Sequence, residues 1–244
     1  MTRTAQMHET DTALPTGSIS ADSKEIEDFI YLISHDFRTS VRALIELPQW
    51  IEEDLAEAGV KIDGSVAESI ELMNRHTGRL DRMLVDLLTF SRVGRMQTME
   101  QIDLNAVLDE VLEEMRIPPG FKVVRALECA DLKMGEIDVL TLLTALISNA
   151  VKHHDRSSGQ IVVTCRSDGT HSVLSVQDNG PGIATDHHDR VFGAMTTLKP
   201  RDEVEGSGMG LAIVKKIAKL YNGDAQVIEN AGSRGTTVEV RLQA

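Results

Sequence analysis

One histidine is followed directly by an aspartate, in the segment Ser34-His35-Asp36-Phe37-Arg38-Thr39. A neutral imidazole nitrogen is a good nucleophile toward phosphorus, and the carboxylate of Asp36 can hold the ring or accept its proton. Thr39 comes one helical turn later, close enough to orient a water. The chain has eight histidines, so the segment by itself is more typical of an ordinary exposed histidine on a helix and needs support from other motifs.

A second candidate segment carries Asn149, Lys152 and His153 near the end of an apolar run. On a helix these three side chains share one face. An amide oxygen beside a cation suits a magnesium-bound triphosphate. The alternative is a set of polar side chains at a helix end that bind nothing, and this segment taken alone favours neither interpretation.

A third motif, Asp178-Asn179-Gly180-Pro181-Gly182-Ile183, follows a predicted strand. Glycines around a proline form a tight turn that is rich in accessible backbone. A buried aspartate there can accept a hydrogen bond from an exocyclic amine such as that of adenine. A plain surface turn is the alternative.

A fourth motif is rich in glycine and opens a predicted helix: Gly206-Ser207-Gly208-Met209-Gly210-Leu211. Glycines let the backbone approach phosphates, and a helix N-terminus favours negative charge. No GK[ST] follows, so this is not a P-loop, and the spacing does not fit a dinucleotide-binding turn. The polar segment 191–205 before it is interpreted as a mobile lid, with Lys199 and Arg201 as cations that could meet phosphates.

The helices that would carry the histidine show a heptad pattern, with alternating steps of four and three. From Lys24 to about Ala56 the apolar or small positions are Ile26, Ile30, Ile33, Phe37, Ser40, Leu44, Leu47 and Ile51. The second run has Val66, Ile70, Met73, Thr77, Leu80, Leu84, Leu87 and Ser91.

Two such helices joined at 57–65 form a hairpin. Because one hairpin has little to bury, we expect a homodimer with a four-helix bundle; a monomeric hairpin packed on the rest of the chain is the alternative. His35 falls opposite the seam and faces water, and Pro48 should kink the first helix or disturb its hydrogen bonds.

The second half mixes periodicities, which predicts an α+β domain with helices on one face of a mixed sheet. Helices are expected at 105–115, 136–153 and 210–221. Strands are expected at 121–127, 160–166, 171–177, 224–228 and 236–242. The division is a disordered tail at 1–23, the hairpin at 24–94, a linker at 95–101 and the second domain at 102–244.

Composition restricts the partners and the compartment. The formal net charge is −13, which disfavours nucleic acid and anionic membranes as partners. The only two cysteines, Cys129 and Cys165, are too few for a disulfide framework, and their spacing is not that of a metal site. A reducing cytoplasm is therefore the simple interpretation. No run approaches the ~18 apolar residues that span a bilayer, and no input domain precedes the hairpin, which suggests control by a separate sensory protein.

The order of these motifs resembles that of the sensor histidine kinase family, from about Lys24 to Leu242. The His35 segment resembles the H-box, Asn149 the N-box asparagine, and Phe192 the F-box phenylalanine. The Asp178 turn resembles the G1 box, and Gly206 to Gly210 resembles the G2 box. Gly235-Thr236-Thr237 resembles the closing glycine-threonine of the family's ATP domain, and two stretches are most similar to phytochrome-linked kinases: 150–155 and 205–210.

The resemblance implies a role for each matching residue. His35 would carry the phosphoryl group, Asp36 would act as its base or orienting partner, and Thr39 would position water for phosphatase action. Asn149 would bind Mg²⁺, and Lys152 and His153 would lie near the phosphates. Asp178 would bind the adenine amine, with Gly180 and Gly182 in the same turn, while Gly206, Gly208 and Gly210 would cradle the triphosphate of ATP. The implied fold is a hairpin dimer followed by a Bergerat-type ATP-binding α/β sandwich.

The sequence departs from the family pattern at three positions. Ser40 stands where the family usually has proline, which puts the bend and signal coupling in doubt. Ala145 replaces a polar residue four before Asn149, which removes a possible magnesium ligand. Met195 stands in the region of a second aromatic residue, so the lid could pack differently.

The implied function is a histidine kinase of a two-component system. It would phosphorylate itself from Mg-ATP and pass the phosphate to an aspartate of a response-regulator receiver domain. One alternative is a phosphotransferase whose nucleotide domain no longer binds ATP, and a second is an ATP-binding scaffold or anti-sigma-type kinase. The signal, the receiver, the kinase–phosphatase balance and the choice between phosphorylation within or across the dimer stay open.

Overall fold

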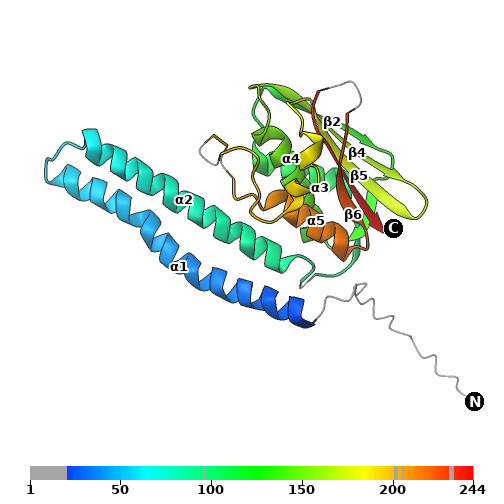
Figure 1. The fold of residues 1–244 in the computed structure, drawn as a ribbon, viewed down its shortest axis with the longest axis horizontal. Coiled ribbons are helices and arrows are strands. Elements are labelled where there is room, and N and C mark those ends of the chain that lie inside the picture. Colours follow the sequence, from blue (N-terminus) through cyan, green and yellow to red (C-terminus); the bar gives the residue numbers. More distant parts are fainter. Residues whose placement is uncertain (1–20, 96, 201–202, 205, 231–233, 244) are drawn as a thin grey trace, which may run out of the picture.

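The computed structural model describes residues 21–95, 97–200, 203–204, 206–230 and 234–243. It contains a long helical hairpin and an α/β domain that lies along it (Figure 1). The hairpin consists of α1 (Ala21–Glu57) and α2 (Gly64–Arg92), as the two heptad runs predict. Residues 21–23, assigned to the tail from the sequence, already belong to α1, and the rest of that tail lies outside the described residues.

Within one chain, α1 packs on α2 through a stripe that differs from the predicted seam by one residue. Ser34, Val41 and Pro48 are buried, whereas Phe37 and Leu44 of the predicted seam are 58% and 47% exposed. A shift of one position turns the packed face by about 100° around the helix axis. The helix runs through Pro48 without ending. The predicted seam is therefore an outward-facing apolar stripe in the single chain.

The α/β domain contains two sheets. Its five-stranded sheet has the order β2-β4-β5-β7-β6, with β2 and β4 parallel and the other neighbours antiparallel. These strands are β2 (Phe121–Leu127), β4 (Gly159–Ser167), β5 (His171–Asp178), β6 (Asp224–Ile228) and β7 (Thr237–Gln243).

A second, two-stranded sheet was missed from the sequence. It pairs β1 (Glu100–Asp103) with β3 (Asp131–Met134) in antiparallel register. Each strand has only four residues, too few for alternation to stand out. The end of the predicted linker therefore forms a strand.

Three helices cover one face of the large sheet, between it and the hairpin (Figure 1). They are α3 (Leu104–Met115), α4 (Glu136–Lys152) and α5 (Gly210–Leu220), and two short 3-10 turns lie at Thr185–His187 and Arg190–Phe192. Apolar residues of α4 and α5 pack against alternating residues of β4, β5 and β7, with Leu142, Ile147, Leu174, Ile217 and Val240 all nearly inaccessible to solvent. The α+β class is confirmed.

A buried polar network fixes the start of α4. The Tyr221 hydroxyl donates to Asp138 Oδ2 at 2.8 Å and accepts from the Gly135 N–H at 2.9 Å. Asp138 Oδ1 accepts from the Gly94 N–H at 3.1 Å. Burial, the first cause, and then the Asp138 carboxylate raise the pKa of Tyr221, so the phenol stays protonated. The network joins α4, the end of α5 and the segment after α2.

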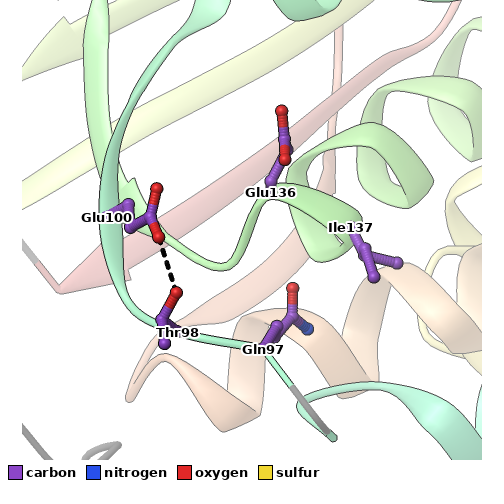
Figure 2. Close-up of a pocket in the computed structure, with 5 residues that line it drawn as sticks. All are labelled: Gln97, Thr98, Glu100, Glu136 and Ile137. Carbon is purple, nitrogen blue, oxygen red and sulfur yellow. Dashed lines mark hydrogen bonds between the residues drawn. The ribbon is translucent and has the colours of Figure 1, made fainter.

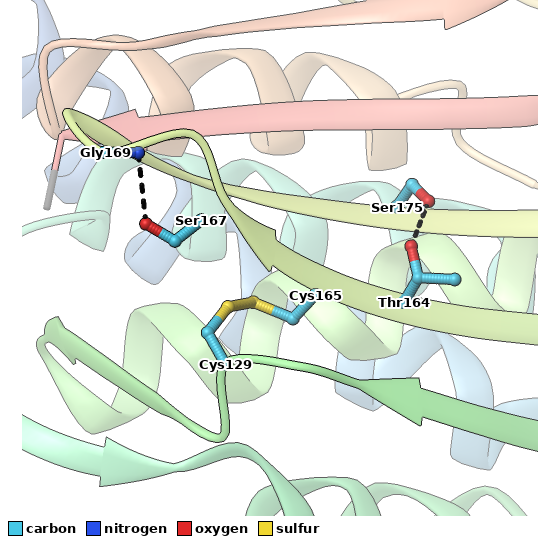
Figure 3. Close-up of a disulfide and its surroundings, with 6 residues drawn as sticks. All are labelled: Cys129, Thr164, Cys165, Ser167, Gly169 and Ser175. Carbon is cyan, nitrogen blue, oxygen red and sulfur yellow. Dashed lines mark hydrogen bonds between the residues drawn. A yellow bond between two sulfur atoms is a disulfide. The ribbon is translucent and has the colours of Figure 1, made fainter.

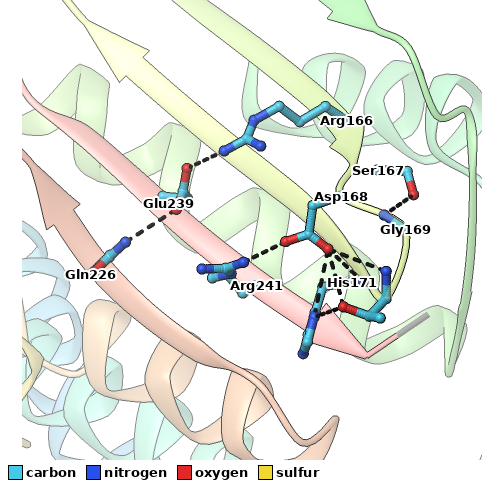
Figure 4. A network of polar contacts seen from close by, with 9 residues as sticks. Arg166, Ser167, Asp168, Gly169, His171, Gln226, Glu239 and Arg241 are labelled. Carbon is cyan, nitrogen blue, oxygen red and sulfur yellow. Dashed lines mark hydrogen bonds and ion pairs between the residues drawn. The ribbon is translucent and has the colours of Figure 1, made fainter.

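The opposite face of the sheet carries charged side chains that pair across strands (Figure 4). Arg166 Nη2 on β4 lies 3.0 Å from Glu239 Oε2 on β7. Asp168, in the β4–β5 turn, pairs with Arg241 of β7. The His171 N–H, followed by Arg241, lowers the pKa of Asp168 to about 2. These contacts tie the turn to the last strand.

The two cysteines form a disulfide, contrary to the expectation of free thiols. Cys129, in the connection between β2 and β3, is bonded to Cys165 of β4 (Figure 3). Cys165 is fully buried. The sequence did not indicate the pair because the two residues are 36 positions apart and meet only when β2 and β4 align.

Candidate phosphoacceptor and nucleotide sites

The His35 side chain lies on the exposed surface of α1, away from the outward apolar stripe. Its Nδ1 is 3.3 Å from Asp36 Oδ1, and the two side chains are 65% and 73% exposed. The Tyr31 ring stacks against the imidazole with 6.4 Å between centroids. Thr39 is exposed further along the same helix. If Asp36 accepts the Nδ1 proton, the lone pair of Nε2 is free to act as a nucleophile.

The Asp178 carboxylate is held at the end of β5 by backbone donors. Asp178 Oδ1 accepts from the Gly180 N–H at 2.8 Å and from the Thr236 N–H at 3.2 Å. The Asp178 N–H in turn donates to the Thr236 carbonyl at 2.9 Å. The fold thus brings Asp178, Gly180 and Thr236 together, although Thr236 is far away in the sequence.

Two glycines beside Asp178, one in its turn and one before β7, are required by space and by conformation. Gly235 has φ +109°, and a Cβ there would lie 1.8 Å from the Asp178 carbonyl oxygen. Gly182 has φ +83°, and its Cβ would lie 3.1 Å from the Gly235 carbonyl oxygen. Because residues with a Cβ rarely adopt such backbone angles, both positions favour glycine.

Burial raises the pKa of Asp178, and the Gly180 and Thr236 N–H groups oppose this shift by stabilising the carboxylate. With Oδ1 engaged by the backbone, Oδ2 is the oxygen that can accept an external N–H. This is the arrangement that recognition of an amino group requires.

A cationic cluster forms at the end of α4. Asn149 is half-buried, Lys152 is exposed, and His153 ends the helix with its N–H donating to the Asn149 carbonyl at 3.1 Å. Burial is the main cause that lowers the pKa of His153, followed by Lys199 and Lys152. Lys199 of the lid therefore lies near the helix end, as the proposed phosphate contacts require.

The glycine-rich loop folds tightly against the lid and the hairpin. Gly208 has φ +78°, and its Cβ would lie 2.6 Å from the Thr196 carbonyl oxygen. The Ser207 hydroxyl accepts from the Met209 N–H at 3.0 Å and donates to Asp86 of α2. Space is open at Gly206 and Gly210.

Two residues predicted to bind the cofactor point into the core instead. The side chains of Met209 and Leu211 are 1% and 8% exposed and belong to the main apolar cluster. The Met209 N–H is taken by the Ser207 hydroxyl, so contact with a phosphate here would use the N–H groups of the first turn of α5, such as that of Leu211, which have no partner within the helix.

The remaining sequence expectations have mixed outcomes. Arg201 lies outside the described residues. Ser40 is exposed, and α1 continues through it. Ala145 packs against the core, and Met195 has φ +58°. In the described part of the chain, no three His, Cys, Asp or Glu side chains gather as a metal site, so Mg²⁺ here would depend on Asn149, water and phosphate oxygens.

A pocket of about 380 Å³ lies apart from all these motifs, at the join between the hairpin and the α/β domain. Figure 2 shows the residues that line it: Gln97, Thr98, Glu100, Glu136 and Ile137. The Thr98 hydroxyl donates to Glu100 at 2.6 Å. With two carboxylates and no cation in its lining, it does not suit a triphosphate.

Sequence reasoning missed an ion-pair cluster between the two parts of the molecule. Glu27 of α1 lies 2.6 Å from Lys216 Nζ of α5 and 3.3 Å from Arg95. Lys216 also donates to the Phe90 carbonyl at 2.7 Å and lies over the Phe90 ring. Arg95 pairs with Asp28 as well. The cluster holds the α/β domain against the hairpin.

The chain is similar to a known ATPase family and to several histidine kinases. Residues 134–244 match the histidine kinase-, DNA gyrase B- and HSP90-like ATPases. The methanogenesis regulatory histidine kinase FilI of Methanothrix harundinacea is 33% identical over 231 residues, covering 91% of this chain and 25% of that protein. Cyanobacterial phytochrome B of a Nostoc species is 28% identical over 236 residues, covering 92% and 30%. The chain spans about a quarter to three-tenths of these relatives.

Solved structures share the arrangement of hairpin and α/β domain. ShkA in complex with AMPPNP has a TM-score of 0.64 at 23% identity, covering 89% of this chain and 46% of that chain. ThkA in complex with the response regulator protein TrrA has a TM-score of 0.60 at 17% identity, covering 90% and 63%. At these identities the likeness shows the fold alone.

Breaking the interdomain cluster should destabilise the docked domain. Glu27→Gln leaves the Lys216 ammonium, only 15% exposed, without its carboxylate, at an expected cost of about 2 kcal/mol. Urea unfolding and proteolysis of segment 93–99 would report the loss as a lower midpoint and faster cleavage.

The matched control for this variant is Asp63→Asn. It breaks the Lys61–Asp63 pair, whose side chains are 86% and 71% exposed, and should change stability by less than about 0.5 kcal/mol. Equal effects of the two variants would contradict the structural role of Glu27.

Proposed function

Because the chain belongs to the sensor histidine kinase family, we propose that it phosphorylates itself on His35 with ATP and passes the phosphoryl group to an aspartate of a response regulator. The observation that carries the proposal is the exposed His35–Asp36 pair on α1, with a 3.3 Å contact between Nδ1 and the carboxylate. A histidine kinase-like ATPase domain follows it in the same chain.

The chemistry assigned to His35 is attack on the γ-phosphorus of ATP. With Asp36 orienting the ring through Nδ1, the new bond forms at Nε2 and the bond to the ADP oxygen breaks. Thr39, one turn further along α1, is the residue proposed to orient water when phosphate is removed from the partner.

ATP is proposed to occupy the open end of the α/β domain. Asp178 would accept the adenine amine, and Lys152, His153 and Lys199 would face the phosphates. Asn149 fits a role as a ligand of Mg²⁺ because its half-buried amide offers an oxygen donor on the same helix end as the proposed phosphate contacts. The metal would neutralise phosphate charge; the chain's residues hold and orient the nucleotide.

The proposed partner is a receiver domain. The solved complex of ThkA with TrrA joins a histidine kinase to a response regulator protein, and its kinase shares this fold. The hairpin around His35 is open to solvent in this chain, which leaves room for such a domain. A separate sensory protein stays a prediction.

Labelling tests the kinase proposal. Incubation with Mg²⁺ and γ-labelled ATP should give acid-labile, alkali-stable label that is absent from His35→Gln, which lacks the nucleophile. Asn149→Ala and chelation of Mg²⁺ should lower the label by at least about hundredfold, since both remove charge stabilisation.

The control variant is His76→Gln, at an exposed position on α2, which should label like the parent chain. Label that persists in His35→Gln would contradict the assigned acceptor. A parent that takes no label from ATP, but accepts phosphate on His35 from a phosphorylated receiver, would instead be a phosphotransferase without ATP binding.

A homodimer is proposed from the outward apolar stripe of the hairpin. On α1 it includes Phe37, Leu44 and Ile51, and on α2 Met73 and Leu80, with exposures between 39% and 58%. A second hairpin would cover both stripes in a four-helix bundle.

Leu44→Glu should weaken this dimer by about hundredfold, because symmetry places two carboxylates in an apolar interface. Sedimentation equilibrium would measure the dissociation constant. Arg42→Glu adds the same residue on the opposite side of α1 and should leave the dimer intact. Monomeric parent protein, or equal weakening by both variants, would refute the proposed interface.

The cytoplasm is the proposed location. Within the described residues, no helix is long and apolar enough to cross a membrane. The Cys129–Cys165 disulfide argues in the other direction, because reducing compartments keep thiols free. Alkylation of denatured protein, taken directly from its cells, separates the two: a pair protected until a reductant is added would contradict the cytoplasmic assignment, and modification of both cysteines would support it.

A further inference from the structure

His154 is a histidine that the proposed mechanism does not use, although its side chain is only 1% exposed. It follows α4 directly, one residue after His153. The Phe121 ring meets it edge-on, with 5.2 Å between the ring centroids. A buried imidazole needs partners for both ring nitrogens, so its two contacts indicate what it does.

The hydrogen bonds fix the protonation state of the ring. The Arg156 N–H donates to His154 Nδ1 at 3.1 Å, so Nδ1 carries no proton. The Gln160 N–H donates to Asn179 Oδ1 at 2.8 Å, so that atom is an acceptor. His154 Nε2 lies 3.1 Å from the same Oδ1 and must therefore be the donor, which makes His154 a neutral Nε2–H tautomer.

Neighbouring glycines leave the space that this bond needs. A Cβ on Gly159 would lie 2.7 Å from His154 Nε2 and 3.0 Å from Asn179 Oδ1. A Cβ on Gly180 would lie 3.2 Å from His154 Cδ2. Because both neighbours are glycines, the imidazole has room to lie between the end of α4 and the Asp178 turn.

A second contact ties the same segment to the closing strand. Asp155 Oδ2 accepts from Arg234 Nη2 at 2.6 Å, and Arg234 precedes Gly235 and Thr236, whose backbone holds Asp178. The segment after α4 therefore reaches both sides of Asp178: Asn179 through His154, and the Thr236 side through Asp155.

We propose that His154 is a positioning residue for adenine recognition, whose bond to Asn179 fixes the turn so that Asp178 Oδ2 faces the exocyclic amine. This inference rests on the proposed nucleotide site. Since Asn179 is adjacent to Asp178 and otherwise exposed, the turn has no other side-chain support of this kind in the described residues. Loss of the bond lets the carboxylate change its angle, which costs the hydrogen bond to the amine.

The test compares ADP with IDP, which lacks the exocyclic amine, using the full chain with Mg²⁺. His154→Thr keeps a hydroxyl that can accept from the Arg156 N–H but cannot reach Asn179. ADP should bind about fivefold more weakly, the effect of one hydrogen bond, while IDP binding stays within about twofold of the parent. A purely structural role would weaken both nucleotides equally.

Two further variants test the bond itself. His154→Thr added to Asn179→Ala should change ADP affinity by less than about twofold, because the bond is already absent. Gly159→Ala should lower ADP selectivity as His154→Thr does. His171→Thr, at the far end of β5, should bind both nucleotides like the parent.

Each outcome decides a different claim. If the parent chain binds neither nucleotide, the proposed nucleotide site is wrong, and this inference falls with it. If the parent prefers ADP and His154→Thr and Gly159→Ala keep the full preference, the site stands and the role of His154 is refuted. Additive losses in the double variant would also refute it.

Discussion

The nucleotide end of the molecule depends on a pair of hydrogen bonds between Asp178, at the end of β5, and Thr236, just before β7. The Asp178 N–H donates to the Thr236 carbonyl. The Asp178 carboxylate accepts from the Thr236 N–H and from the Gly180 N–H, so backbone donors hold it at the end of β5. The closeness of these two segments explains Gly235, where a Cβ would meet the Asp178 carbonyl. Because each charged-group hydrogen bond is worth about 1.5–3 kcal/mol, the arrangement offsets part of the cost of burying Asp178.

Heptad spacing and strand alternation predicted the hairpin and the large sheet within a few residues, because α1, α2 and α4 are long and periodic and β4 alternates in burial. The four-residue strands β1 and β3 were missed, since their pairing is set by tertiary contact. The packed face of α1 was displaced by one residue for a similar reason: the chain has two apolar stripes, and periodicity alone does not say which one faces α2. The disulfide was missed because it depends on the β2–β4 register.

For the site, motif types indicated Asp178, the glycines and His35, because each has local chemistry that a sequence displays. His154, Lys216 and Asp86 belong to no comparable motif. His154 matters through Asn179, Lys216 through Glu27, and Asp86 through Ser207, so each role exists only once distant segments meet. Met209 and Leu211 show the opposite case: both lie inside a recognised motif, but their side chains pack in the apolar core.

The segment after α2 determines where the α/β domain can turn relative to the hairpin. Gly94 has φ +76°, the Leu220 side chain occupies the place where its Cβ would be, and its N–H is held by Asp138. Gly94 is therefore held by contacts with α4 and α5 of the α/β domain. Val93 also belongs to the main apolar cluster, so a rotation that keeps these contacts must turn at Arg92 or earlier in α2. The ion pairs of Glu27 with Arg95 and Lys216 lie beside this junction, so a turn of the α/β domain relative to α1 would have to open them.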